Sequence, residues 1–327
     1  MTVNRMLRSM AAASRRSERE SMRRQREHEK QEKQFTKLQA IEDVAFEVEE
    51  FENRVALLKS MHQDCSETWN WQKIRDSEPP EKPIKRNDNE TFAIQSMDNY
   101  KPSIGDKLFR KVEKKKLALA DEVEKAKDTD EVIYKENNKK YESEFNEWND
   151  VKGLASRIIN SDIAAYKEAI EQVNPFNEIN EIGSSIEFKI LSKEIMDVTL
   201  NVNSSETIPS EEKTQLKSGK LSVKQMPKSK FYELYQDYVC SCVLRVAREI
   251  VSLLPIEKVL VTAVAELLNK KTGYLETQPI LSVQIPKITL NKLNFANIDP
   301  SDAMSNFKHN MSFKKTVGFD AVEKMTL

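Results

Sequence analysis

The stretch SSIEFKILSKEIMDVTLNVN, residues 184–203, decides the fold, because the spacing of apolar residues changes there. Apolar and polar residues alternate along it, and the apolar positions are Ile186, Phe188, Ile190, Met196, Val198, Leu200 and Val202. Alternation is the period of a β-strand with one buried face. The stretch therefore predicts two strands, joined near residues 192–194.

On the N-terminal side of this stretch the spacing is helical. From Phe35 to Trp69, apolar residues recur every three or four positions, and a second such pattern runs from about 103 to 160. Prolines at 79, 80 and 83 lie in a polar segment at 76–102, which we interpret as a linker. A helix of this length needs a partner for its apolar stripe to be stable in water. We therefore expect residues 35–160 to form a long antiparallel helical hairpin resembling a coiled coil, although pairing between chains would cover the same apolar stripes.

On the C-terminal side, residues 161–327 predict a compact domain with a mixed sheet. The expected order is αβββαββα: helix 161–182, strands 186–190, 195–203 and 219–226, helix 228–253, strands 257–266 and 280–286, and a short helix after Asp299. The fold class is thus α+β. We divide the chain into a basic arm (1–34), the hairpin (35–160) and the α+β domain (161–327).

The composition favours long exposed helices and a reducing compartment. Charged residues make up 32% of the chain and nearly cancel, with 52 basic and 53 acidic residues, so the net charge gives no case for nucleic-acid binding. Three cysteines, no signal-peptide pattern and no membrane-length apolar run lead us to expect a cytoplasmic protein with free thiols and no membrane partner. Cys240 and Cys242 would point about 200° apart on a helix, so we expect them in a core.

One order of elements suggests an enzyme. Asp197 lies on the second predicted strand and Lys224 on the third, and the order helix, three strands, helix, strand looks like the core of the PD-(D/E)XK nuclease superfamily. The resemblance implies that these two residues serve a divalent metal ion that activates water. The family has an acid two residues before the lysine, and here that position is Ser222. A helical glutamate such as Glu181 would have to replace it. We expect Mg²⁺ only under this alternative, and otherwise no metal and no cofactor.

The N-terminal arm is the second candidate site. It holds six arginines within twelve residues, a residue type whose planar fork suits phosphate: Arg15, Arg16, Arg19, Arg23, Arg24 and Arg26. Glutamates between them could instead pair with them along a solvated helix. Residues 1–40 carry a net charge of +6, whereas 41–52 carry six acids and no base. The arm therefore predicts contact with nucleic acid or an acidic surface, or a solvated helix.

Taken together, these patterns favour a non-catalytic interaction or assembly protein. The hairpin would mediate self-association or bind a protein partner. The alternatives are a metal-dependent nuclease and a nucleic-acid-binding protein without catalysis, so whether the chain is an enzyme stays open. Two smaller predictions concern Arg245 and Glu249, spaced to pair on a helix, and His309, which follows the Asp299 cap and could act as an acid or base.

Overall fold

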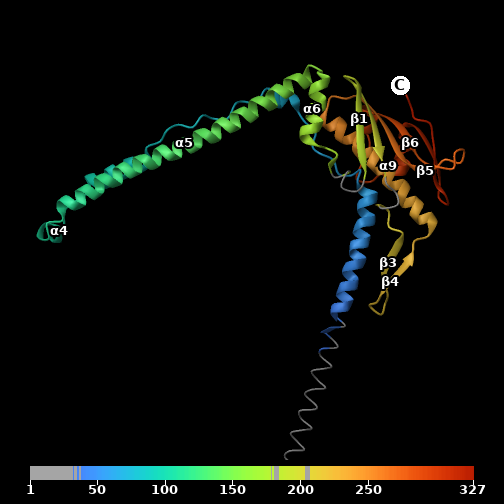
Figure 1. Cartoon of the computed structure of the whole chain (residues 1–327), viewed down its shortest axis with the longest axis horizontal. Helices are drawn as coiled ribbons and strands as arrows, with labels where there is room; N and C mark the ends of the chain where they lie inside the picture. Colours follow the sequence, from blue (N-terminus) through green and yellow to red (C-terminus); the bar gives the residue numbers. More distant parts are fainter. Residues whose placement is uncertain (1–31, 33–34, 37, 178, 180–183, 203–206) are drawn as a thin grey trace, which may run out of the picture. The chain divides into compact units, whose positions relative to one another are not determined.

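The computed structural model describes residues 32, 35–36, 38–177, 179, 184–202 and 207–327 (Figure 1). The chain forms two compact units. One is Thr68–Val173, which we call the helical unit, and the other joins Met1–Glu67 to Asn174–Leu327, which we call the sheet unit. Long helices come before a mixed sheet along the chain, so the α+β fold class is confirmed. The division at 34 and 160 stays a prediction.

The helical unit is built on one long helix. This helix, α5 (Val112–Ile159), has 48 residues and is about 70 Å long at 1.5 Å per residue. The other helices of the unit are α2 (Trp71–Arg75), α3 (Asp88–Asp98), α4 (Ile104–Leu108) and α6 (Ile163–Val173). In Figure 1, α4 lies at one end of α5 and α6 at the other. The segment that carries α2 and α3 therefore runs alongside α5 toward α4, and the chain then returns as α5 itself.

Two sets of hydrogen bonds fix this antiparallel course. Trp148 Nε1 of α5 donates to Ser77 Oγ at 2.9 Å. Further along α5, the Asp130 carboxylate accepts the backbone N–H groups of Asn89 at 3.3 Å and Glu90 at 2.9 Å. These N–H groups lie in the first turn of α3, whose own N-cap residue makes no side-chain cap. They also hold the pKa of Asp130 below its usual value. Asp130 thus caps α3 from the side.

The partner of α5 differs from the one that we predicted. We expected the helix of residues 35–70 to cover α5, but in the helical unit α2 and α3 do so. The helix of residues 38–60 belongs to the sheet unit, and α3 lies within the segment predicted as a linker. Apolar spacing shows which side chains share a helix face, but it does not show which other segment covers that face.

The sheet unit contains a six-stranded mixed sheet with strand order β1-β2-β5-β6-β7-β8. The strands are β1 (Ser185–Ser192), β2 (Ile195–Asn201), β5 (Lys258–Leu268), β6 (Leu275–Pro286), β7 (Lys308–Lys314) and β8 (Gly318–Asp320). Strands β2 and β5 are parallel, and the other neighbours are antiparallel. The two strands predicted at 184–203 are β1 and β2, joined where the alternation breaks.

One long helix, α9 (Lys228–Leu253), packs on this sheet, with contacts to β5 and β8. The alternate residues Met196, Val198 and Leu200 of β2 are fully buried. Cys240 and Cys242 of α9 are also fully buried and free. Burial raises the pKa of the Cys242 thiol to about 12. The prediction that both cysteines belong to a core is therefore confirmed.

A small hairpin stands outside the main sheet. Its strands, β3 (Glu211–Gln215) and β4 (Leu221–Gln225), pair only with each other. We expected residues 219–226 to be the third strand of the main sheet. No residue of β3 or β4 is buried, so the face of β4 that carries Leu221 and Val223 does not belong to a core. The predicted order otherwise recurs, with β3, β7 and β8 as additional strands and with α10 (Lys287–Leu290) and α11 (Pro300–Ala303) near its end.

The N-terminal helix, residues 38–60, is anchored at its C-terminal end. Arg245 donates to the carbonyl of Met61 at 3.4 Å, and Arg248 donates to that of His62. These arginines satisfy carbonyls of the turn that directly follows the helix, and positive charge is favourable near a helix C-terminus. Arg245 also pairs with Glu249 at 2.6 Å at the predicted spacing. The charged side of α9 is therefore the docking point of this helix.

Candidate docking groove

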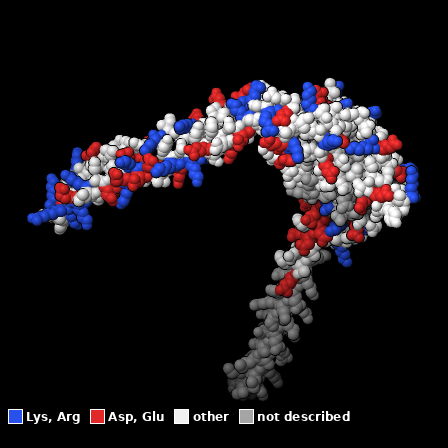
Figure 2. Space-filling view, turned by 45° about the horizontal axis from the view of Figure 1, so that its top comes forward, with Lys and Arg blue, Asp and Glu red and all other residues white. Residues whose placement is uncertain are grey.

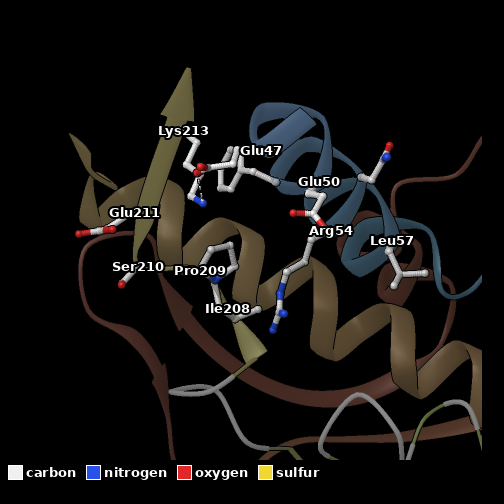
Figure 3. Close-up of a pocket in the computed structure, with 11 residues that line it drawn as sticks. Glu47, Glu50, Arg54, Leu57, Ile208, Pro209, Ser210, Glu211 and Lys213 are labelled. Carbon is white, nitrogen blue, oxygen red and sulfur yellow. Dashed lines mark hydrogen bonds and ion pairs between the residues drawn. The ribbon is translucent and has the colours of Figure 1, made fainter. Parts of the chain in front are cut away.

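A groove lies beside the N-terminal helix (Figure 3). Its volume is about 810 Å³, and it runs between the helix and residues 208–213. Phe51 and Leu57 of the helix and Ile208 and Pro209 on the opposite wall give it an apolar lining. Figure 3 shows Ile208 and Pro209 facing the helix that carries Glu50 and Arg54. An apolar lining open to solvent is typical of a binding surface.

Charged side chains surround this apolar lining. Glu47 pairs with Lys213 at 3.0 Å, the contact marked in Figure 3. Arg54 donates to the Thr207 carbonyl at 3.0 Å, which ties the helix to the opposite wall. Glu50 and Glu211 also line the groove, from the helix and from the start of β3. Acidic side chains from both walls thus border the apolar lining.

The β3–β4 hairpin holds the helix in place above the groove. Gln215 Nε2 donates to the Ile41 carbonyl at 3.0 Å. Gly219, in the turn of the hairpin, has a φ of +81°, and a Cβ added to it would lie 2.6 Å from Ile41 Cγ1. Only glycine adopts this conformation without strain and leaves room for the isoleucine. The hairpin therefore covers the apolar stripe at Ile41.

The deeper end of the helix is held by a buried histidine. His62 is 1% exposed, and its backbone N–H donates to Ser241 Oγ at 2.9 Å. Its Nδ1 lies 2.9 Å from the same oxygen. Burial lowers the pKa of His62, so the imidazole is neutral in the fold. This residue and Leu58, also buried, fix the helix against α9.

The outer surface of the helix is acidic and partly apolar. Residues 41–52 contain six acids and no base. Figure 2 shows acidic side chains gathered on the described part of this helix. Phe46 is 62% exposed and Leu57 45%. The groove therefore opens beside a surface of strong negative charge that also presents large apolar side chains.

The structure does not bring the two proposed nuclease residues onto neighbouring strands. Asp197 lies on β2, whose neighbours are β1 and β5, while Lys224 lies on β4 in the separate hairpin. The Asp197 carboxylate accepts a hydrogen bond from Lys324 at 2.8 Å. Across the described part of the chain, no group of three or more His, Cys, Asp or Glu side chains is arranged to hold a metal ion. The nuclease alternative stays a prediction.

Other predicted site residues fall elsewhere. Glu181 lies outside the described residues, and so do the arginines of the arm, Arg15, Arg16, Arg19, Arg23, Arg24 and Arg26. Nucleic-acid binding through the arm therefore stays a prediction.

His309 does reach a cavity, of about 620 Å³, which Asp237 and Asp299 also line. Its Nδ1 lies 3.0 Å from the Phe307 carbonyl, so this nitrogen is the donor and Nε2 is left as an acceptor in the neutral ring. Burial raises the pKa of Asp237, and Lys59 lies 3.5 Å from its carboxylate. Such groups could exchange protons with a polar ligand, so the acid or base role of His309 stays a prediction.

Comparisons with known proteins assign no family. The chain matches no protein-family model, no curated protein and no solved structure. Within the residues that the structure describes, no helix is both long and apolar enough to cross a membrane.

The sequence indicated one wall of this groove, the acidic helix, but not the opposite wall. The acidic run at 41–52 was visible in the sequence, but Ile208 and Pro209 were not recognised as partners of the helix. They lie in a polar segment about 150 positions away along the chain, and no periodicity links the two. Phe46 and Leu57 lie outside the apolar stripe of this helix, and apolar residues off the stripe were the signal that could have indicated a binding surface.

Proposed function

We propose that this protein is a non-catalytic interaction or assembly protein that binds a basic amphipathic segment of a protein partner in its groove. The observation that carries this proposal is the apolar groove, which opens beside the acidic surface of the N-terminal helix. A partner helix with apolar residues on one side and Lys or Arg on the other would fit both features.

The two features have different physical roles. The apolar lining supplies affinity because water leaves it when a partner enters. The acidic residues supply orientation and a faster association rate, and this contribution falls with salt. Leu57 lies where the apolar lining meets the acidic surface of the helix, since it lines the groove and is 45% exposed.

The residues that line the groove favour binding over chemistry. Glu47 is already paired with Lys213, and Arg54 binds a backbone carbonyl. The described lining includes neither histidine nor cysteine, the side chains that most often act as base or nucleophile near neutral pH. Binding of a partner requires only apolar surface and charged side chains, and the residues that line the groove provide both.

A fluorescent probe peptide tests the proposal. The probe is a labelled helical peptide with leucines on one side and lysines on the other, and its counterpart has glutamate in place of each lysine. We expect the full chain to bind the basic peptide in fluorescence anisotropy, and more weakly in high salt. The double variant Glu50→Lys with Leu57→Asp should weaken binding by at least about tenfold.

The matched control carries the same changes on other exposed surfaces, Glu122→Lys on α5 and Leu268→Asp at the end of β5. This control should bind like the wild type. Equal binding of the basic and acidic peptides would contradict the proposal, as would equal loss in the control and the groove variant.

A further inference from the structure

The end of the helical unit carries a turn with a fixed structure. At this end of α5 in Figure 1, α4 connects α3 to α5. The carboxylate of Asp106, which is 7% exposed, accepts hydrogen bonds from Tyr100 Oη at 3.2 Å and from the Ser103 N–H at 3.1 Å. It also pairs with Lys115 Nζ at 2.7 Å. The lysine and these hydrogen bonds lower the pKa of Asp106 to about 2, so the turn keeps this charge at physiological pH.

This fixed turn presents large apolar side chains to solvent. Ile104 is 88% exposed, Leu108 75% and Phe109 68%. Ile104 and Leu108 are one helical turn apart in α4, so they lie on the same side of it. The next residue, Arg110, has a φ of +52°, a left-handed conformation that is uncommon for residues other than glycine. A strained backbone that exposes three apolar side chains is typical of a binding site.

The same end of the unit is basic. Residues 100–117 contain seven basic and two acidic residues, a net charge of +5. Figure 2 shows Lys and Arg side chains gathered at the end of the unit where Figure 1 places α4. The ammonium of Lys111 lies 5.6 Å from the centre of the Phe109 ring. We call residues 100–117 the basic tip.

The basic tip and the groove match in both charge and chemistry. Residues 41–57, which form one wall of the groove, contain six acidic residues and one basic residue, a net charge of −5. The tip offers apolar side chains that stand out from its surface, and the groove offers a hollow of about 810 Å³ that is partly lined by apolar side chains. We propose that the basic tip of one copy docks in the groove of a second copy of this chain. This inference rests on the proposed function and names the partner.

The proposed contact joins two different surfaces, so it is a head-to-tail contact. Each copy that uses its tip still has a free groove, and the next copy can bind there. Such contacts generate rings, the smallest of which is a reciprocal pair, or open chains. The contact area is confined to one turn and one groove, so we expect weak association that grows with concentration.

Two variants separate head-to-tail docking from other modes. The tip variant is Leu108→Ser with Phe109→Ser, and the groove variant is Glu50→Lys with Glu211→Lys. All four positions are exposed, so the fold should tolerate the changes, which circular dichroism checks. We expect the wild type to associate in sedimentation velocity between about 1 and 100 µM, and each variant alone to remain a monomer.

An equimolar mixture of the two variants is the decisive sample. The groove variant keeps a working tip and the tip variant keeps a working groove, so the mixture should form a dimer and nothing larger. A matched control, Leu268→Ser with Tyr274→Ser, removes exposed apolar side chains near the β5–β6 turn and should associate like the wild type.

Three results would overturn the inference. One is a wild type that stays monomeric over the whole range, as expected if the tip docks within its own chain. A second is a mixture of variants that stays monomeric, as expected if the tip does not bind the groove at all. The third is a monomeric protein whose tip binds vesicles of phosphatidylserine and phosphatidylcholine, which would assign the tip to a lipid surface. In each case, binding of the basic probe peptide by the groove would still support the proposed function.

Discussion

The substitution Gly219→Ala tests whether the β3–β4 turn holds the N-terminal helix. It should destabilise the protein in two ways. Alanine at a φ of +81° costs about 1 to 2 kcal/mol, because its Cβ approaches the following carbonyl. The new Cβ would also lie 2.6 Å from Ile41 Cγ1. Moving the isoleucine to a less favourable rotamer adds about 1 kcal/mol. We expect a total loss of about 2 to 3 kcal/mol.

Gly273→Ala is the matched control, since Gly273 has a φ of +75° and nothing lies within 4 Å of an added Cβ. Urea unfolding followed by circular dichroism should show a loss of about 1 to 2 kcal/mol there, from the backbone alone. In an Ile41→Ala background, Gly219→Ala should cost no more than Gly273→Ala does. If the two glycine substitutions cost the same in the wild type, the turn does not press on Ile41, and our account of how the helix is held is wrong.

Three further predictions concern other parts of the chain. Gly153→Ala should stabilise the protein by about 1 kcal/mol, because Gly153 is an exposed position within α5 with open space around it. All three tryptophans lie in the helical unit, so tryptophan fluorescence during urea unfolding reports the stability of that unit. An unchanged unfolding midpoint would contradict this prediction. Burial lowers the pKa of His62 in the fold. Between pH 6.5 and this lower folded pKa the unfolded chain is protonated at His62 and the folded chain is not, so stability should fall as the pH falls through that range. His62→Gln should reduce this slope in urea titrations at successive pH values, whereas an equal slope would show that His62 is not neutral in the fold. In the native protein a thiol reagent should modify Cys65 but not the buried Cys240 and Cys242. All three cysteines should react after denaturation. Reaction of all three before denaturation would show that α9 does not stay packed in the native protein.

The groove illustrates where sequence reasoning succeeds and where it fails. The acidic run at 41–52 and the apolar stripe of the helix are both local, so they can be read directly from the sequence. The opposite wall, Ile208 and Pro209, meets the helix through long-range contacts such as that between Arg54 and Thr207. Nothing in the spacing of either segment encodes that contact.

The basic tip was missed for a different reason. Ile104 and Leu108 fit a helical spacing, and that spacing normally predicts a covered face. The structure leaves both exposed, because the buried Asp106 forms the turn with polar contacts instead of an apolar core. A helical pattern in a segment of five residues therefore predicts a helix, but not its burial.

By itself, the sequence determined the change from helical spacing to alternation near position 184 and the place of two cysteines in a core helix. These are local properties, since the period of the backbone decides which side chains share a face. Only the tertiary structure decided what covers each face: α2 and α3 on α5, the β3–β4 hairpin on the N-terminal helix, and Lys324 beside Asp197. Burial is a property of two surfaces, and the second one comes from residues far away in the chain.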